Sequence, residues 1–83
     1  MIMLPVQCRM ARAALDLALR DLAAAAKVSI DTVARFERGE ELKERTVEAL
    51  QRVLEDAGVV FIDENGEGPG VRLHKRVHKK PGK

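Results

Sequence analysis

Apolar side chains recur at helical spacing through the first two thirds of the chain, and this pattern predicts four short helices. Pro5 suits the first turn of a helix, and no helix breaker interrupts the chain from there to Leu17. Further on, a run of four alanines favours helix and lets a neighbouring helix approach closely. Apolar residues from Val47 to Ala57 follow an amphipathic period, and Gly58 ends it. The predicted helices are Pro5–Asp16, Leu19–Lys27, Ile30–Arg38 and a fourth that begins at Lys43 or Thr46 and ends at Ala57.

After Gly58 the pattern changes to that of a β-hairpin. Residues 59–62 are β-branched and aromatic, and Val71 to His74 alternate between apolar and polar. Residues 63–70 between them are dense in Asp, Asn, Gly and Pro, which form turns. Because an isolated two-stranded hairpin is marginal in water, it is expected to pack on the helices or to add its edge to another chain. Two hairpins paired across a two-fold axis would make a four-stranded sheet and a homodimer.

The segment from Ser29 to Gly39 carries the signals for both ends of a helix. Ser29 can cap the free amides of the first turn, and Gly39 can take the left-handed conformation that ends a helix. Val33 and Phe36 share one face, which leaves polar side chains on the other. A short helix directly after another is the geometry of a helix-turn-helix, whose second helix enters the major groove of duplex DNA. The sequence therefore predicts a DNA-binding domain.

Size and charge refine this interpretation. A chain of 83 residues forms one domain that buries only about 60% of its unfolded surface, and a single cysteine excludes an intrachain disulfide, so oligomerisation is the expected source of further stability.

Residues 1–65 carry nine Lys or Arg and twelve Asp or Glu, a balance of −3. Residues 66–83 carry six Lys or Arg and one Glu, a balance of +5, and together these give +2. A basic tail attracts phosphates without regard to sequence, although it can also be a solubilising segment with no partner.

Residue types that other functions need are scarce. Two Phe and no Tyr or Trp disfavour base stacking on single-stranded nucleic acid. No apolar run approaches the ~20 residues of a membrane span, and the chain does not begin like a signal peptide, so a cytoplasmic protein is expected. His74 and His78 lie in the basic tail and are not expected to bind metal, and Cys8 lies on an apolar helix face as a small hydrophobe. We therefore expect neither enzymatic activity nor a cofactor.

The helical region also carries residues in an order typical of one family: Arg12, Leu22-Ala23, Val28-Ser29 and the run from Thr32 to Gly39. This set resembles the helix-turn-helix domain of the lambda and 434 repressors and Cro, the Xre-like family, over about residues 5–58. The hairpin sequence from Phe61 to Leu73 is similar to the end of many short Xre-like proteins. The resemblance implies a mainly helical, four-helix repressor-like domain over residues 1–58, a hairpin over 59–75 that can serve dimerisation, and a basic flexible tail over 76–83.

The resemblance assigns roles to individual positions. Three side chains fall where repressors contact base edges: Ile30, Asp31 and Arg35. Arg12 and Glu37 fall where family members join the first and third helices by a buried ion pair. Ser29 and Thr32 fall at phosphate or base contacts, and other side chains suit phosphates by their positive charge: Arg9, Arg20, Lys27, Arg38, Lys43 and Arg45.

The chemistry of these side chains supports part of that assignment. Arg35 can make a bidentate contact to O6 and N7 of guanine, the commonest base-specific contact. Ile30 can touch a thymine methyl group, and Asp31 can accept from a cytosine amino group. Asp31 also suits the first turn of any helix because of the helix dipole, and the arginines can equally be solvated surface residues.

Three positions depart from the family pattern. Ala18-Leu19 replace the polar cap and the Gln that usually begin the second helix, which removes a phosphate contact and a base contact. Lys27 replaces a usual Gly and therefore requires either a strained backbone or a different turn. Asp16 replaces another usual Gly and suggests an early cap for the second helix.

Taken with the resemblance, the sequence predicts a small transcriptional regulator, by default a repressor, that binds duplex DNA as a dimer. The third helix of each copy would contact one half-site, with half-sites about 34 Å apart. The alternative is a protein-interaction module, such as an antitoxin, whose hairpin and tail hold a partner protein. A third interpretation is a general nucleoid-type binder driven by the tail.

Overall fold

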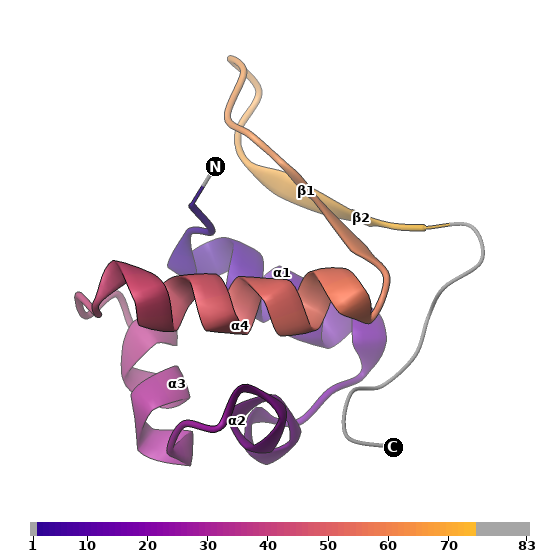
Figure 1. Cartoon of the computed structure of the whole chain (residues 1–83). Coiled ribbons are helices and arrows are strands. Elements are labelled where there is room, and N and C mark those ends of the chain that lie inside the picture. Colours follow the sequence, from indigo (N-terminus) through magenta and orange to yellow (C-terminus); the bar gives the residue numbers. More distant parts are fainter. Residues whose placement is uncertain (1, 75–83) are drawn as a thin grey trace.

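The computed structural model describes residues 2–74, which form four helices followed by a two-stranded antiparallel hairpin (Figure 1). The elements are α1 (Pro5–Leu15), α2 (Leu19–Ala26), α3 (Ile30–Glu37), α4 (Glu44–Asp56), β1 (Val59–Ile62) and β2 (Gly70–Leu73). The predicted helices and hairpin are thus confirmed, with ends that differ from the prediction by no more than two residues. The predicted basic tail and His78 lie outside the described residues. Within the described part of the chain, no helix has the length and apolar character needed to cross a membrane.

A single core joins the four helices and the hairpin. Leu22 of α2, Val33 of α3 and Leu50 of α4 are fully buried in it. The hairpin lies on α1 and α4, on the side away from α2 and α3, and its tip projects beyond the helices (Figure 1). The hairpin therefore covers one side of the molecule, and α3 lies on the opposite side.

The hairpin packs through one face. Val59 pairs with Leu73 and Phe61 with Val71, and all four side chains pack against the core. Because side chains alternate along a strand, Arg72 and its partner across the ladder lie on the outer face. The hairpin thus has the apolar layer on the helices that an isolated hairpin lacks.

A buried amide anchors this hairpin to the start of α1. The side chain of Gln7 is fully buried, and its Nε2 donates to the carbonyls of Ile62 at 2.9 Å and Gly70 at 3.0 Å. Its Oε1 accepts from the backbone N–H of Leu4 at 2.9 Å. These three hydrogen bonds satisfy a polar group that would otherwise be costly to bury.

Asp16 and Lys27 both have left-handed backbone conformations, with φ of 55° and 61°. Each closes the helix before it, through bonds such as that from Leu17 N to Arg12 O at 2.8 Å. The expectation that Asp16 caps α2 is therefore wrong, because Asp16 ends α1 and α2 begins after Ala18, which provides no side-chain cap. Lys27 keeps the left-handed backbone conformation, which costs about 1–2 kcal/mol at a residue other than glycine.

Candidate nucleic-acid interface

α2 and α3 are joined by three residues, Lys27 to Ser29, and the turn is closed by hydrogen bonds at both ends. Val28 N donates to Ala23 O at 3.0 Å, which completes the end of α2. Ser29 Oγ accepts from Thr32 N at 3.0 Å, so the predicted cap of α3 is confirmed. The hydroxyls of Ser29 and Thr32 are also bonded to each other at 2.8 Å.

The inner face of α3 is fixed by burial and by charge. Val33 and Phe36 are buried in the core, as their spacing predicts. Arg12 of α1 donates from Nε and Nη2 to the two carboxylate oxygens of Glu37, each at 2.7 Å. The Glu37 side chain is only 7% exposed, and this pair raises the pKa of Arg12, chiefly through the hydrogen bond to Glu37. The structure thus brings together the two residues for which the resemblance implies an ion pair.

Two other side chains of α1 support the same contact. Arg9 donates to the backbone carbonyl of Glu37, at the last residue of α3. Cys8 is fully buried beside Glu37; burial first, and then the hydrogen bond to Glu37, raises the pKa of its thiol well above the ordinary value. The Cys8 thiol therefore stays neutral and packs as a core group. The hydrogen bond from Arg9 links α1 to the end of α3.

The outer face of α3 presents the three predicted base contacts. Ile30 is 52% exposed, the Asp31 side chain 74% and the Arg35 side chain 44%. Asp31 and Arg35 are four positions apart and are therefore neighbours on the helix surface, and Ile30 directly precedes Asp31 in the first turn of α3. Ile30 is one of four large apolar side chains that are exposed in the described part of the chain, with Ile2, Leu4 and Met10.

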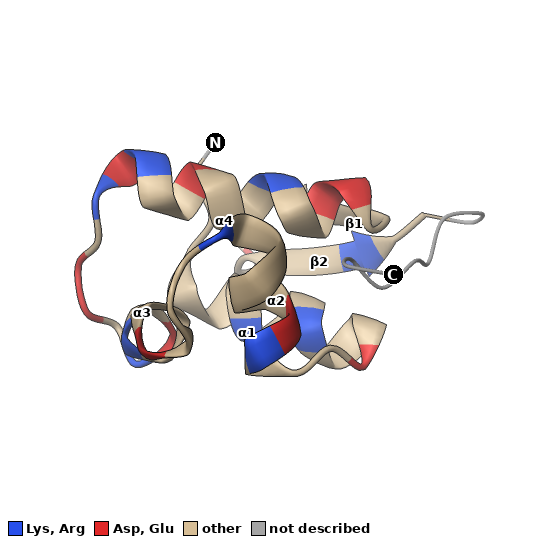
Figure 2. Ribbon diagram, turned by 60° about the horizontal axis from the view of Figure 1, so that its bottom comes forward, with Lys and Arg blue, Asp and Glu red and all other residues tan. Residues whose placement is uncertain are grey.

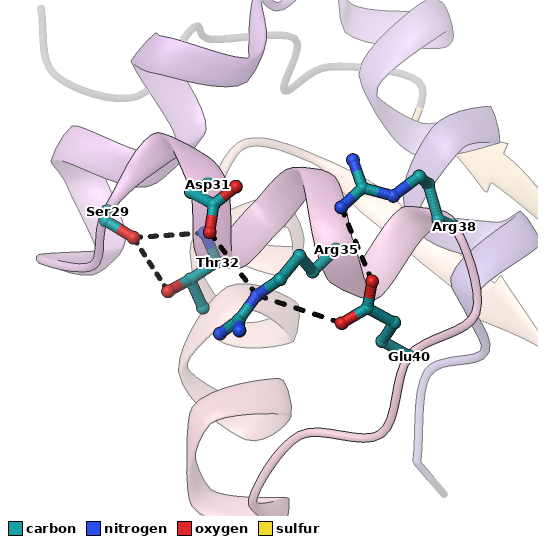
Figure 3. Close-up of polar contacts among 6 residues, drawn as sticks. All are labelled: Ser29, Asp31, Thr32, Arg35, Arg38 and Glu40. Atoms are coloured by element: carbon teal, nitrogen blue, oxygen red, sulfur yellow. Dashed lines mark hydrogen bonds and ion pairs between the residues drawn. The ribbon is translucent and has the colours of Figure 1, made fainter.

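Acidic residues hold the arginines of this face (Figure 3). Arg35 Nε lies 3.5 Å from Asp31 Oδ2 and 4.0 Å from Glu40 Oε1. The other oxygen of Glu40, Oε2, lies 3.4 Å from Nη2 of Arg38. The two terminal nitrogens of Arg35 point away from both carboxylates (Figure 3). Arg35 Nε is buried and makes no hydrogen bond, so the two carboxylates restrain Arg35 through charge alone, and its side chain stays 44% exposed.

The remaining predicted phosphate contacts are spread over several surfaces. Arg20, in the first turn of α2, lies 3.9 Å from Asp21, and Lys43 is exposed at the start of α4. Lys27 and Arg45 line a groove between α2 and α4. Figure 2 shows basic and acidic segments interspersed on α3 and α4. The structure therefore does not gather these side chains into one basic patch.

Two residues important to this geometry were not singled out from the sequence. Glu40 lies beyond the end of the predicted third helix, yet it contacts both arginines near the end of α3. Gln7 lies on the same helical stripe as Ala11 and Leu15, and a polar residue on an apolar stripe is a signal that could have found it.

Comparison with models of known protein families gives no match for this chain, and no curated protein matches it either. The Xre-like resemblance therefore remains a prediction that rests on the motif residues of the helical region.

Proposed function

We propose that the protein is a sequence-specific duplex DNA-binding regulator that acts as a dimer, with α2 and α3 as a helix-turn-helix. The observation that carries this proposal is the outward face of α3. Ile30, Asp31 and the partly exposed Arg35 lie on that face, while Val33, Phe36 and the Glu37 ion pair fix the opposite face. A helix held in this way can enter a major groove with its side chains toward the base edges.

The charges near α3 favour selective rather than strong binding. Asp31 and Glu40 offset Arg35 and Arg38 on the described surface. Sequence-independent affinity for DNA comes mainly from cationic contacts to phosphates, so this surface contributes little of it. The basic residues after position 74 are then the main source of general attraction, and α3 is the source of sequence preference.

Selection of bound sequences from a random duplex pool tests the proposal. We expect enrichment of a palindromic site whose halves lie a whole number of helical turns apart, about 34 Å or a multiple. Arg35→Ala should relax the preference at one position in each half-site, at a cost of about 1–3 kcal/mol in discrimination. Arg72→Ala, on the outer face of the hairpin, is the matched control and should leave the consensus unchanged. A wild-type chain that enriches no sequence would contradict the proposal.

A protein-interaction module is the second candidate, and it is favoured by exposed apolar side chains near the hairpin. Ile2 and Leu4 are exposed, and both line a shallow hollow with Pro69 of the hairpin loop. Surface patches of this kind mark protein contacts more often than nucleic-acid contacts. The two candidates differ at low salt: a DNA-binding protein retains duplex at about 50 mM salt, whereas a pure interaction module does not.

A further inference from the structure

A groove between α2 and α4 is open to solvent, and small apolar side chains form its floor. Ala26 of α2 and Ala49 and Val53 of α4 lie there, and each is partly exposed. The distance between two packed helices depends on the size of the side chains at their contact, so small side chains permit a close approach. The groove can therefore receive one further helix.

Charged side chains of alternating sign follow the α4 side of this groove. They are Arg45, Glu48, Arg52 and Asp56, and Figure 2 shows the alternation along α4. Successive members are three or four positions apart, so they lie along one side of the helix. Within the described chain none of these four side chains takes part in a hydrogen bond or an ion pair, in contrast to the arginines near the end of α3. Their charges are therefore available to another molecule.

This order of charges is complementary to itself when a second α4 runs in the opposite direction. An antiparallel pair centred between Glu48 and Arg52 places Arg45 beside the partner's Asp56. The same register places Glu48 beside the partner's Arg52. A parallel pair would instead set every charge beside its like, and an antiparallel pair shifted by one turn would set Arg45 beside the partner's Arg52. Opposite dipoles also favour the antiparallel direction.

We propose that two copies of this chain dimerise by antiparallel packing of α4 against α4 in the groove beside α2. Ala49 and Val53 of both copies then lie near the two-fold axis, and each charged contact occurs twice because the interface is symmetric. The apolar part of the contact is small, and charged residues are scarce in the centres of strong interfaces. The dimer is therefore expected to be weak, with a dissociation constant on the order of 100 μM.

The inference deepens the dimer of the proposed function and rests on that function for its role. α3 lies at the end where α4 begins (Figure 1), so antiparallel pairing places the α3 helices of the two copies at opposite ends of the paired helices. With 13 residues, α4 is about 20 Å long. No described residue that lines the groove belongs to α3, so the contact does not need its outer face. Each copy can then contact its own half-site.

Sedimentation equilibrium of the full chain without DNA tests the pairing of charges. Arg45→Glu and Asp56→Arg should each weaken the dimer by about 5- to 30-fold, because two like-charge contacts replace two attractive ones. The double variant should recover most of that loss, since both contacts return with reversed sign. The two positions lie eleven residues apart on one helix, about 16 Å, so the recovery cannot arise within a single chain.

Matched controls separate this contact from effects on folding and on net charge. Arg45 and Asp56 are exposed, and each substitution places at its helix end the sign of charge that the helix dipole favours, so both variants should fold. Arg72→Glu, on the outer face of the hairpin, changes the net charge as Arg45→Glu does and should leave dimerisation unchanged. Equal weakening by Arg72→Glu, no recovery in the double variant, or a monomer at all concentrations would overturn the proposal.

Selection from the random duplex pool distinguishes failure of the dimer from failure of DNA binding. Arg45→Glu should enrich the same bases as the wild-type chain but without a fixed spacing between half-sites. A chain that dimerises through α4 without selecting DNA loses only the proposed function. A monomer that selects a single half-site loses only the dimer.

Discussion

At the scale of single residues, Arg12 and Glu37 hold α3 against α1 through two parallel hydrogen bonds of 2.7 Å. Removal of one partner from a buried pair leaves the other without compensation and typically costs about 3–5 kcal/mol. Since Arg12 keeps some exposure, we expect Glu37→Ala to lower the free energy of unfolding by an amount near the lower end of that range. Urea unfolding measures this loss. Glu41→Ala, at an exposed neighbouring carboxylate, is the control. Equal midpoints for the two variants would show that the pair does not stabilise the fold.

Cys8 makes stability depend on alkaline pH. Its folded-state pKa is raised by burial, and by the hydrogen bond to Glu37, above an ordinary value near 9. The thiol therefore stays protonated in the folded chain while it ionises in the unfolded one, so its contribution is complete below pH 9 and declines as the pH rises. We expect the free energy of unfolding to fall by up to about 1.4 kcal/mol per pH unit above that point, in the presence of a reductant. Cys8→Ala should lack this slope, and an identical slope in both chains would assign it to other groups.

These residues differ in how far the sequence could predict them. Ser29 and Val33 follow from local rules, because a cap and a helix face depend on neighbours a few positions away. Arg12 and Glu37 are 25 positions apart, and only the family resemblance connected them. Gln7 bonds to carbonyls 55 and 63 positions away, so its partners exist only once the hairpin has packed on α1.

At the scale of elements, the helices were predictable because each has its own apolar period, whereas their ends were less so. The expected roles of Asp16 and Lys27 depended on backbone conformation, and left-handed residues other than glycine are uncommon enough that composition does not reveal them. The same limit applies to the segment after α3. Glu40 belongs to no helix, but the turn at Gly39 returns it to the outer face of α3, next to Arg35 and Arg38.

The position of Glu40 on that element leads to a prediction about DNA binding. We expect Glu40→Gln to raise the affinity for all duplexes about 3- to 10-fold, because a carboxylate no longer opposes the phosphates. It should also lower the ratio of specific to random binding, because Arg35 and Arg38 lose their common partner. Glu41→Gln removes an equal charge one residue away and makes neither contact, so it should raise affinity without changing the ratio. Filter binding to a selected site and to random duplex measures both quantities, and equal ratios in the two variants would exclude a positioning role for Glu40.

At the scale of the whole molecule, charge is divided between a mildly acidic body and a basic end. From this division we expect the end of the chain to provide sequence-independent attraction to DNA and α3 to provide sequence preference. Deletion of residues 77–83 tests the two contributions separately. The deletion removes three lysines and keeps Lys75 and Arg76. We expect the slope of log K against log salt to become shallower by up to about 3, since each lost phosphate contact accounts for about 0.9.

The same deletion should weaken binding to every duplex by a similar factor and leave the selected consensus intact. Arg35→Ala should do the opposite, with a nearly unchanged salt slope and a relaxed base position. Titration of both variants at several salt concentrations, on a selected site and on random duplex, compares them directly. If the deletion changed the consensus, the end of the chain would have to contact bases. If Arg35→Ala changed only the slope, Arg35 would contact phosphate, and α3 would then provide no sequence preference through it.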